Sequence, residues 1–259
     1  MHNKERSGDE PILRPADFVK YCCKAANRRL VENTSLFLCY DDDQFRAMVM
    51  DLARRRRISK RIGNVALLKN SPVVLVGRFG IGAPAVVAQC EELIACGTRR
   101  IISLGTAASM TGEIGVGDVV VCEKAFSEEG TSGHYVPGRE VFGATQHLAD
   151  EIYAHLNKQG VRCKMGSAWT TDAPYRETAR KRNAFLAKDA SVVEMEASAL
   201  YMLATYRKVE ALSVFVVGDS IAGSTWEPHF KDKQVRMQLK IIGQRLLDFL
   251  ISKPLSPLS

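Results

Sequence analysis

The sequence predicts an α/β protein, a single-domain three-layer sandwich whose mixed central sheet is flanked by helices. Short β-branched and apolar runs alternate along the chain with longer segments in which apolar residues recur at helical spacing. The chain has 259 residues, of which 46% are hydrophobic and 25% charged, so it can bury a sizeable core. This composition excludes a disordered, collagenous or disulfide-scaffold protein.

The expected elements alternate from the start of the chain. A helix with a proline near its beginning is predicted over residues 15–30, and a strand over 36–40 runs into three aspartates. A helix follows over 44–56. Strands are expected over 62–68 and 72–76, and a glycine-rich loop then leads into a helix over 83–96.

The second half continues the same alternation. Strands are predicted over 101–104, 116–123, 163–169 and 211–217, and helices over 145–158, 176–187, 194–207 and 231–251. The sequence contains no internal repeat, low-complexity tract or linker. We therefore expect one domain over 34–252, preceded by a polar tail and helix (1–33) and followed by a short tail (253–259).

The formal net charge of +7 raises the question of a polyanionic partner. Much of the excess is concentrated in Arg54 to Arg57, Lys60 and Arg61, and no aromatic residues interleave with this run to stack on bases. We interpret the run as a solvated helix end and expect no nucleic-acid partner.

The cysteines and the apolar segments indicate a compartment. The seven cysteines form no CxxC pair and no metal-ligand spacing, and most lie in apolar runs. No segment approaches the roughly 20 apolar residues of a membrane span, and the first residues lack a signal-peptide pattern. A reduced, cytoplasmic protein with no metal site and no membrane contact is expected.

Four predicted strand ends carry unusual chemistry, and ligands gather at such ends in a sheet of this kind. The first is a three-glycine loop over 77–85, in which Gly80-x-Gly82-x-x-Ala85 matches the dinucleotide fingerprint. The acidic residue expected about 20 positions later is missing. A tight turn, or an anion held at the start of the next helix, explains the loop better. The second is Gly105-Thr106-Ala107, whose N–H and hydroxyl groups can reach a phosphate or sugar, or which is only a close-packed turn.

The other two strand ends carry carboxylates. Glu194 and Glu196 flank Met195 at a strand-to-helix junction, where acidic residues also serve simply to favour the helix dipole. Asp219 directly follows a strongly apolar strand, so partial desolvation would raise its pKa and let it hold a proton near neutrality. A helix cap or turn is the alternative role for Asp219.

These four segments, in this order, resemble the nucleoside phosphorylase family, which includes hexameric purine nucleoside phosphorylase, uridine phosphorylase and the methylthioadenosine/adenosylhomocysteine nucleosidases. The similarity runs from about residue 36 to 250. Its most specific parts are the segment 193–199 and Asp219, supported by 80–84, 105–107, 116–120, 130–135 and 169–178.

The resemblance implies cleavage of an N-glycosidic bond through a transition state with oxocarbenium character on the ribose. Asp219 matches the family's general acid, which protonates or hydrogen-bonds the departing base. Glu194, Met195 and Glu196 match its ribose-binding segment, where carboxylates accept hydrogen bonds from the sugar hydroxyls and the methionine packs on the sugar. The implied base-binding residues are Ala107, Ala108, Thr171, Tyr175 and Val193.

Phosphorolysis requires a site for inorganic phosphate, which would be a co-substrate in an enzyme with no other cofactor. The purine phosphorylases of the family carry Gly-Asp-Pro-x-Arg after the first strand and a second Arg before the Gly-Ser/Thr turn. This chain instead has Asp42-Asp43-Gln44-Phe45-Arg46 at the first place and Ser103 at the second. The candidate phosphate-binding residues are Arg46, Arg78, Thr106 and Gly82.

These departures leave the reaction open. The related nucleosidases lack the second Arg and carry a carboxylate in the first loop that activates water, a part that Asp41, Asp42 or Asp43 can play. An N-cap cluster is the alternative for these aspartates. We expect a phosphorylase that converts a purine nucleoside and phosphate to free base and ribose 1-phosphate, with a nucleosidase as the first alternative. A non-catalytic nucleoside- or nucleotide-binding module is the second.

The resemblance also has implications for substrate and assembly. Pyrimidine specialists of the family read uracil with a Gln and Arg pair that this chain does not place, and Arg176 is a candidate for a substrate phosphate or a base edge, or a surface residue. The expected partners are a small-molecule nucleoside, phosphate and further copies of the chain, as a dimer or a trimer of dimers. His134 or Tyr135 would then be donated to a neighbouring site, unless they are solvated loop residues.

Overall fold

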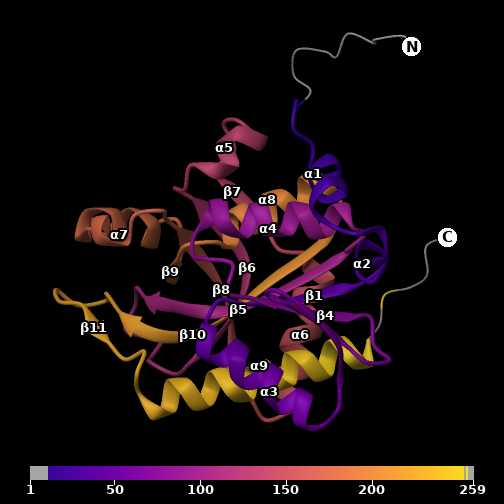
Figure 1. The fold of residues 1–259 in the computed structure, drawn as a ribbon. Helices are drawn as coiled ribbons and strands as arrows, with labels where there is room; N and C mark the ends of the chain where they lie inside the picture. The colour runs from indigo at the N-terminus through magenta and orange to yellow at the C-terminus, as the bar shows by residue number, and fades with distance from the viewer. Residues whose placement is uncertain (1–10, 254, 256–259) are drawn as a thin grey trace.

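A central sheet with helices on both faces makes up the computed structural model, which describes residues 11–253 and 255 (Figure 1). One face is covered by α1 (Pro15–Cys22), α4 (Ala83–Ala95) and α8 (Ala197–Arg207), the other by α3 (Asp42–Arg54), α6 (Gln146–Lys158) and α9 (Lys233–Ser252). Shorter helices are α2 (Ala25–Arg29), α5 (Thr131–Tyr135), η1 (Pro174–Arg176) and α7 (Ala179–Leu186). The three-layer α/β prediction is confirmed.

The sheet of the described chain has eleven strands, in the order β11-β10-β6-β8-β9-β5-β1-β4-β3-β2, with β7 paired to β6. Their bounds are β1 (Ser35–Cys39), β2 (Ile58–Ile62), β3 (Val65–Leu68), β4 (Val73–Gly77), β5 (Arg100–Ser109), β6 (Val119–Ser127), β7 (Val141–Gly143), β8 (Cys163–Thr170), β9 (Val192–Glu194), β10 (Glu210–Ser220) and β11 (Glu227–Pro228). Strand β5 runs parallel to β1 and β10 but antiparallel to β9, which makes the sheet mixed as predicted. Because β5 pairs with both β9 and β10, the strands β5, β10, β6, β8 and β9 close into a ring.

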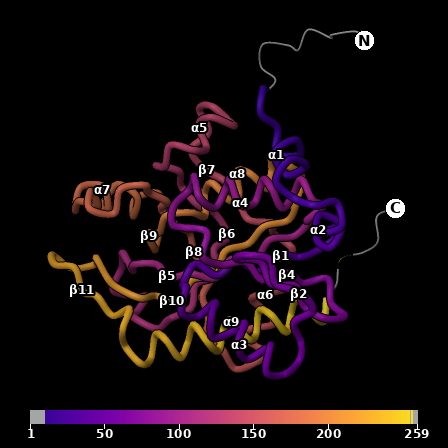
Figure 2. The backbone as a smooth tube through the Cα atoms, in the orientation of Figure 1, coloured from indigo at the N-terminus to yellow at the C-terminus, as the bar shows by residue number. Residues whose placement is uncertain are grey.

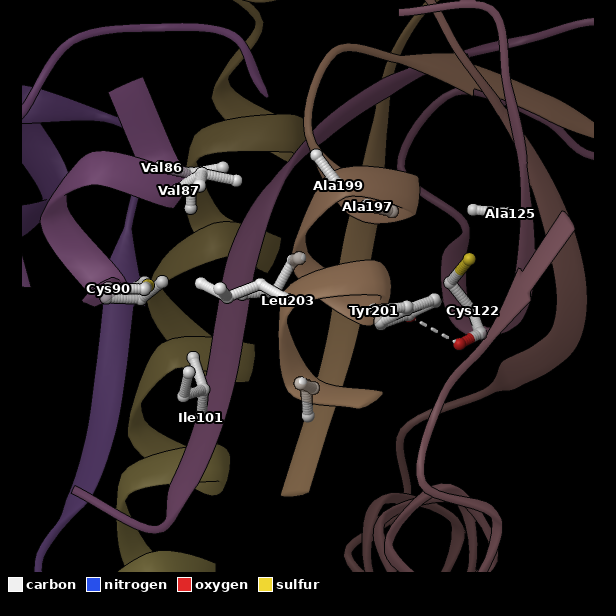
Figure 3. Packing of buried hydrophobic residues seen from close by; sticks show 14 of the residues in the cluster. Val86, Val87, Cys90, Ile101, Cys122, Ala125, Ala197, Ala199, Tyr201 and Leu203 are labelled. Carbon is white, nitrogen blue, oxygen red and sulfur yellow. Dashed lines mark hydrogen bonds between the residues drawn. The ribbon is translucent and has the colours of Figure 1, made fainter. Parts of the chain in front are cut away.

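The two largest of three apolar clusters in the described chain lie on the two faces of this sheet. The core under α4 and α8 includes Val86, Cys90, Ile101 and Leu203, all fully buried (Figure 3). Within it the Tyr201 hydroxyl donates to the Cys122 carbonyl at 2.7 Å and accepts the Ser213 N–H at 3.0 Å. Because both partners belong to the ring of strands, this one side chain ties α8 to β6 and β10 without leaving a buried polar group unpaired.

Several predicted boundaries were wrong, each for a local reason. The helix expected over 15–30 is broken into α1 and α2, because Cys23 and Lys24 are extended. The single strand expected over 62–68 instead contains a turn and the second strand of a hairpin. Gly63 takes a positive φ of 57° and reverses the chain between β2 and the antiparallel β3. The helices expected from 176 and 194 begin only at Ala179 and Ala197. The short elements α5, β7, β9 and β11 were not predicted, since they have too few residues to show a period.

The N-terminal part of the predicted polar tail, residues 1–10, lies outside the described residues, as do 254 and 256–259 of the C-terminal tail. The domain boundaries at 34 and 252 stay predictions. Within the described part of the chain, none of the helices has the length and apolarity needed to cross a membrane.

Gly77 at the end of β4 is expected to tolerate no side chain. A Cβ built at this position would lie 2.4 Å from Cγ of Phe45, whose side chain is 1% exposed. Gly77→Ala should therefore lower the free energy of unfolding by about 1–3 kcal/mol, measured by urea denaturation. Gly133→Ala is the matched control, because a Cβ there meets nothing within 4 Å. Equal stability of the two variants would contradict this explanation.

Candidate active site

Three neighbouring strands place a row of predicted site residues side by side. Asp219 of β10 pairs with Ala108 of β5, and Ala108 pairs with Val193 of β9. Ala107 pairs with Val217 one step earlier in the same ladder. The structure thus brings the predicted acid together with three predicted base-site residues, at the carboxyl ends of the parallel strands β5 and β10, near the end of the molecule that carries α7 and β11 (Figure 2).

Asp219 lies in a partly desolvated position. Asp219 is 7% exposed, and the indole Nε1–H of Trp226 donates to its Oδ2 at 2.8 Å. Burial raises the pKa of Asp219 above its usual value, while the hydrogen bond from Trp226 and the nearby His229 oppose that rise. Nearby, burial together with the charges of Asp219 and Glu128 raises the pKa of Glu177 to about 7. Acidic groups here can therefore hold protons closer to neutrality than in water.

Glu194 is committed to the start of α8. Its Oε1 accepts the Thr170 hydroxyl at 2.5 Å, and its Oε2 accepts the N–H groups of Glu196 and Ala197, each at 2.8 Å. Four N–H groups at a helix start lack intrahelical partners, and a carboxylate there satisfies them and complements the dipole. Glu194 thus fills the helix-start role that was the alternative for this segment, and its predicted contact with ribose stays a prediction.

Glu196 presents its carboxylate to the glycine-rich loop. Its Oε1 accepts the Gly82 N–H at 2.6 Å, and Gly82 has a φ of 92°, a conformation that disfavours any side chain. Burial, and next the charge of Glu194, raise the pKa of Glu196. Met195 lies half-buried between the two glutamates. The Gly82 N–H, predicted to bind phosphate, donates to a carboxylate instead in this structure.

Two predicted phosphate ligands share one cavity. A cavity of about 230 Å³ is lined by the arginines Arg46, Arg61 and Arg78, together with Phe45, Val49 and Met50. Arg78 Nε lies 3.8 Å from Oδ2 of Asp42, and both side chains are largely exposed. Such an exposed pair contributes little to stability, so it leaves Arg78 free to change partner. The wall of this cavity is mostly apolar, and the three arginine side chains that contribute to it make it a candidate anion site.

The first loop and Ser103 differ from the phosphorylase pattern in ways the structure explains. The Asp41 carboxylate accepts the Gln44 N–H at 2.6 Å, so it caps α3 as the alternative interpretation held. The Ser103 hydroxyl donates to the Ser213 hydroxyl at 2.8 Å, and both residues are buried. Ser103 is therefore part of the sheet interior.

The remaining predicted residues are spread around the row. Thr106 is half-buried, with its Cβ 3.2 Å from where a Cβ of Gly218 would lie. Thr171 is 2% exposed, and its N–H donates to the Glu194 carbonyl at 2.9 Å. Tyr175 is 99% exposed on η1 and is not brought against the row, so its stacking role stays a prediction.

The residues outside this region have other surroundings. Arg176 and His134 are exposed, and the Tyr135 hydroxyl donates to Glu91 of α4 at 3.1 Å. Arg54 to Arg57 are exposed at the end of α3, as the charge pattern predicted.

Sequence reasoning missed two aromatic side chains of the site. Tyr40 follows β1, and its ring lies where a side chain on Gly105 would clash, with a distance of 2.8 Å to Cδ2. The Tyr40 hydroxyl is buried; burial, and next the charge of Glu196, raise its pKa. The second missed aromatic side chain is that of Trp226. The available signal was its place, as an aromatic residue in a polar run shortly after a candidate acid.

A family profile described as "Phosphorylase superfamily" matches residues 53–248. This chain belongs to the phosphorylase superfamily.

This superfamily member is 31% identical over 144 residues to the DeoD-type purine nucleoside phosphorylase of Exiguobacterium sp., covering 55% of this chain and 61% of the relative. It is also 31% identical over 156 residues to the uridine phosphorylase of Treponema pallidum, covering 56% and 60% of the two chains. The alignments therefore span about three fifths of these relatives' lengths. Its fold matches the crystal structure of the Campylobacter jejuni 5′-methylthioadenosine/S-adenosyl homocysteine nucleosidase with a TM-score of 0.70 and 18% identity, covering 85% of this chain and 99% of that one.

The described residues of this phosphorylase-superfamily chain contain no group of three or more His, Cys, Asp or Glu side chains placed to hold a metal ion. The two relatives are named as phosphorylases, enzymes for which inorganic phosphate is the co-substrate.

Proposed function

We propose that the chain is a nucleoside phosphorylase that cleaves the N-glycosidic bond of a purine nucleoside with phosphate, giving free base and ribose 1-phosphate. One observation carries the proposal. The row Asp219, Ala108 and Val193 runs across three strands to the junction that holds Glu196, so an acid for the base and a carboxylate for the sugar share one edge of the sheet.

The sugar side of the reaction would depend on Glu196. Its Oε1 accepts the Gly82 N–H, and further lone pairs of the carboxylate remain for ribose hydroxyls. These hydrogen bonds strengthen as positive charge develops on the ribose, and a buried carboxylate stabilises that charge more than water would. Met195 would pack on the sugar beside it.

The base side would depend on Asp219. As the bond breaks, electrons move onto the purine, and a proton delivered to a ring nitrogen neutralises the departing base. The raised pKa of Asp219 favours the protonated form that can deliver it. Ala107, Ala108, Thr171 and Val193 would form the floor of the base site, with Tyr175 at its rim.

Arg46 and Arg78 would bind the phosphate that attacks the sugar, with the Thr106 hydroxyl as a further donor. Guanidinium groups bind phosphate oxygens through paired hydrogen bonds. Arg78 begins the same loop that ends at Gly82 on Glu196, which connects the anion site with the sugar site along the chain.

Hydrolysis is the competing function, and the burial of Ser103 within the sheet favours it. Because Ser103 is buried and bonded to Ser213, no guanidinium occupies the place of the family's second phosphate ligand. Water would then replace phosphate as the nucleophile, with Asp42 or Asp43 as the candidate base.

Phosphate dependence separates the two reactions. We expect release of free base from purine nucleosides to require phosphate, and the double variant Arg46→Gln/Arg78→Gln to raise the KM for phosphate about tenfold or more, since each charged hydrogen bond contributes about 1.5–3 kcal/mol. Arg55→Gln is the matched control, because Arg55 is an exposed arginine at the end of α3, the helix of Arg46, and its Nε lies 2.9 Å from Oδ2 of Asp51. Undiminished turnover without phosphate would show hydrolysis, and binding without any turnover would show a non-catalytic module.

The preference for purine over pyrimidine, purine salvage in the cytoplasm and assembly into dimers or a trimer of dimers belong to the same proposal. The family resemblance supports all three. Assembly is further supported by the side chain of Ile81, which is 71% exposed beside Gly82 and would be covered by a neighbouring subunit. Nucleic acid and membranes are not among the proposed partners.

A further inference from the structure

The loop of residues 221–226, which joins β10 to β11, folds back over the candidate acid. Pairing of β11 with β10 places Pro228 opposite Asp219 and Glu227 opposite Ser220. Between them Trp226 turns its indole N–H onto Oδ2 of Asp219 at 2.8 Å although the tryptophan is 59% exposed. Besides this hydrogen bond, the ring of Trp226 has one tilted contact with Phe230, at 6.4 Å between ring centroids. An exposed aromatic side chain with so few contacts needs its backbone to be fixed, or the hydrogen bond is lost to side-chain entropy.

Arg182 of α7 fixes that backbone. Its Nη1 lies within hydrogen-bond distance of three consecutive carbonyl oxygens, those of Ile221, Ala222 and Gly223, at 2.6, 2.9 and 2.6 Å. A cation that binds successive carbonyls restrains the loop at its beginning, while the β10–β11 pairing restrains its end. Arg182 itself is remote in sequence from both Asp219 and Trp226.

We propose that Arg182 and Trp226 are positioning residues for Asp219: Arg182 holds the 221–226 loop, the loop aims the indole N–H at Oδ2, and Oδ1 is left to face the base. Among the described residues no hydrogen bond to Oδ1 is found. The carboxyl group therefore has one oxygen assigned to the protein and one available for substrate. This inference rests on the proposed function for the role of Asp219, but the contacts themselves do not.

The charged groups around this carboxylate determine how it titrates. The charge of Asp219 raises the pKa of Glu177, beyond η1, and two such like charges oppose each other's ionisation. His229, next to β11, favours ionisation, and its Nδ1 is itself 2.8 Å from Oδ2 of Asp232. The indole N–H adds a donor that favours the charged form of Asp219.

Nitrogen-15 NMR of the indole groups tests the proposal without any turnover. The chain has two tryptophans, Trp169 and Trp226, so two indole signals are expected, and Trp226→Phe assigns them. Trp169 donates to Glu128 at 2.9 Å and provides an internal reference for folding. The Trp226 signal should shift as the pH passes the pKa of Asp219, and this titration should be absent in Asp219→Asn. A titration that persists in Asp219→Asn would overturn the assigned contact.

The role of Arg182 is tested in the same spectra. Arg182→Gln should move the Trp226 signal toward that of a free indole and leave the Trp169 signal in place, whereas Arg180→Gln on the same helix should leave both unchanged. Arg182→Lys, which keeps the charge, serves if the glutamine variant does not fold. An unmoved Trp226 signal in a folded Arg182 variant would overturn the role of Arg182.

Turnover provides the second readout. In Trp226→Phe the pKa of Asp219 should rise, because a donor to its charged form is lost. The alkaline limb of the pH–activity profile, where Asp219 loses its proton, should then move to higher pH, with kcat lowered about tenfold. An alkaline limb that stays in place in Trp226→Phe would contradict the positioning role. A wild-type protein without any turnover would contradict only the proposed function.

Discussion

Asp219→Asn is expected to lower kcat/KM for nucleoside cleavage about 10²–10⁴-fold while the protein stays folded, because general acid catalysis contributes about that much. The amide matches the carboxyl group in size and can still accept the Trp226 N–H through its oxygen. It cannot transfer a proton to the departing base. Steady-state rates of base release for both proteins, with urea denaturation to verify folding, measure the effect.

The control for this prediction is Asp150→Asn, an exposed aspartate on α6 that accepts only the Gln146 side chain in the described structure. It should retain full activity. Unchanged rates in Asp219→Asn would remove Asp219 from the proposed mechanism, whatever the outcome for phosphate dependence.

Glu196→Gln should lower kcat/KM about 10- to 150-fold, the equivalent of one charged hydrogen bond of about 1.5–3 kcal/mol. An amide still accepts a hydrogen bond but carries no charge to stabilise the developing oxocarbenium ion. Because burial and Glu194 raise the pKa of Glu196, the wild-type enzyme should gain activity with rising pH as this carboxyl ionises. The variant should lack that limb of the profile.

The same substitution has an opposite effect on stability. A carboxyl whose folded-state pKa is above its unfolded value costs stability as the pH rises from the unfolded toward the folded pKa. Glu196→Gln should therefore unfold at higher urea concentration than wild type at alkaline pH, and the difference should shrink at acidic pH. Glu113→Gln, an exposed control, should change neither property. A wild-type pH profile retained in Glu196→Gln would exclude Glu196 as the titrating group.

How far the sequence predicted the site depends on the range of the interaction concerned. Asp219 and Glu196 were predicted because each lies near the end of an apolar run, a pattern that neighbouring residues create, and their roles stay predictions. In the structure Asp219 is the next-to-last residue of β10, and Glu196 lies two residues beyond β9. The capping role of Asp41 was likewise among the alternatives, since an N-cap bonds within its own helix turn. By contrast, nothing near Arg182 or Tyr40 in the chain indicates that one meets the 221–226 loop and the other lies against Gly105.

The same limit explains the errors in the fold. Long periodic elements such as α4, α6 and α9 were predicted to within a few residues, because burial of one face imposes a repeat on the sequence. The strand β9 has three residues and exists because β5 and β8 pair with it on either side. Its neighbours determine that conformation, and a window of sequence does not contain them.

By itself the sequence determined the α/β class, the order of the main elements and the superfamily, since these depend on local periodicity and on short motifs that survive at low identity. Only the tertiary structure decided which motif residues share a surface and which are already bonded. It placed the Gly82 N–H on Glu196, used Glu194 to start α8, and aimed Trp226 at Asp219. The physical reason is that a carboxylate's free lone pairs, which decide what it can bind, depend on donors brought to it from distant parts of the chain.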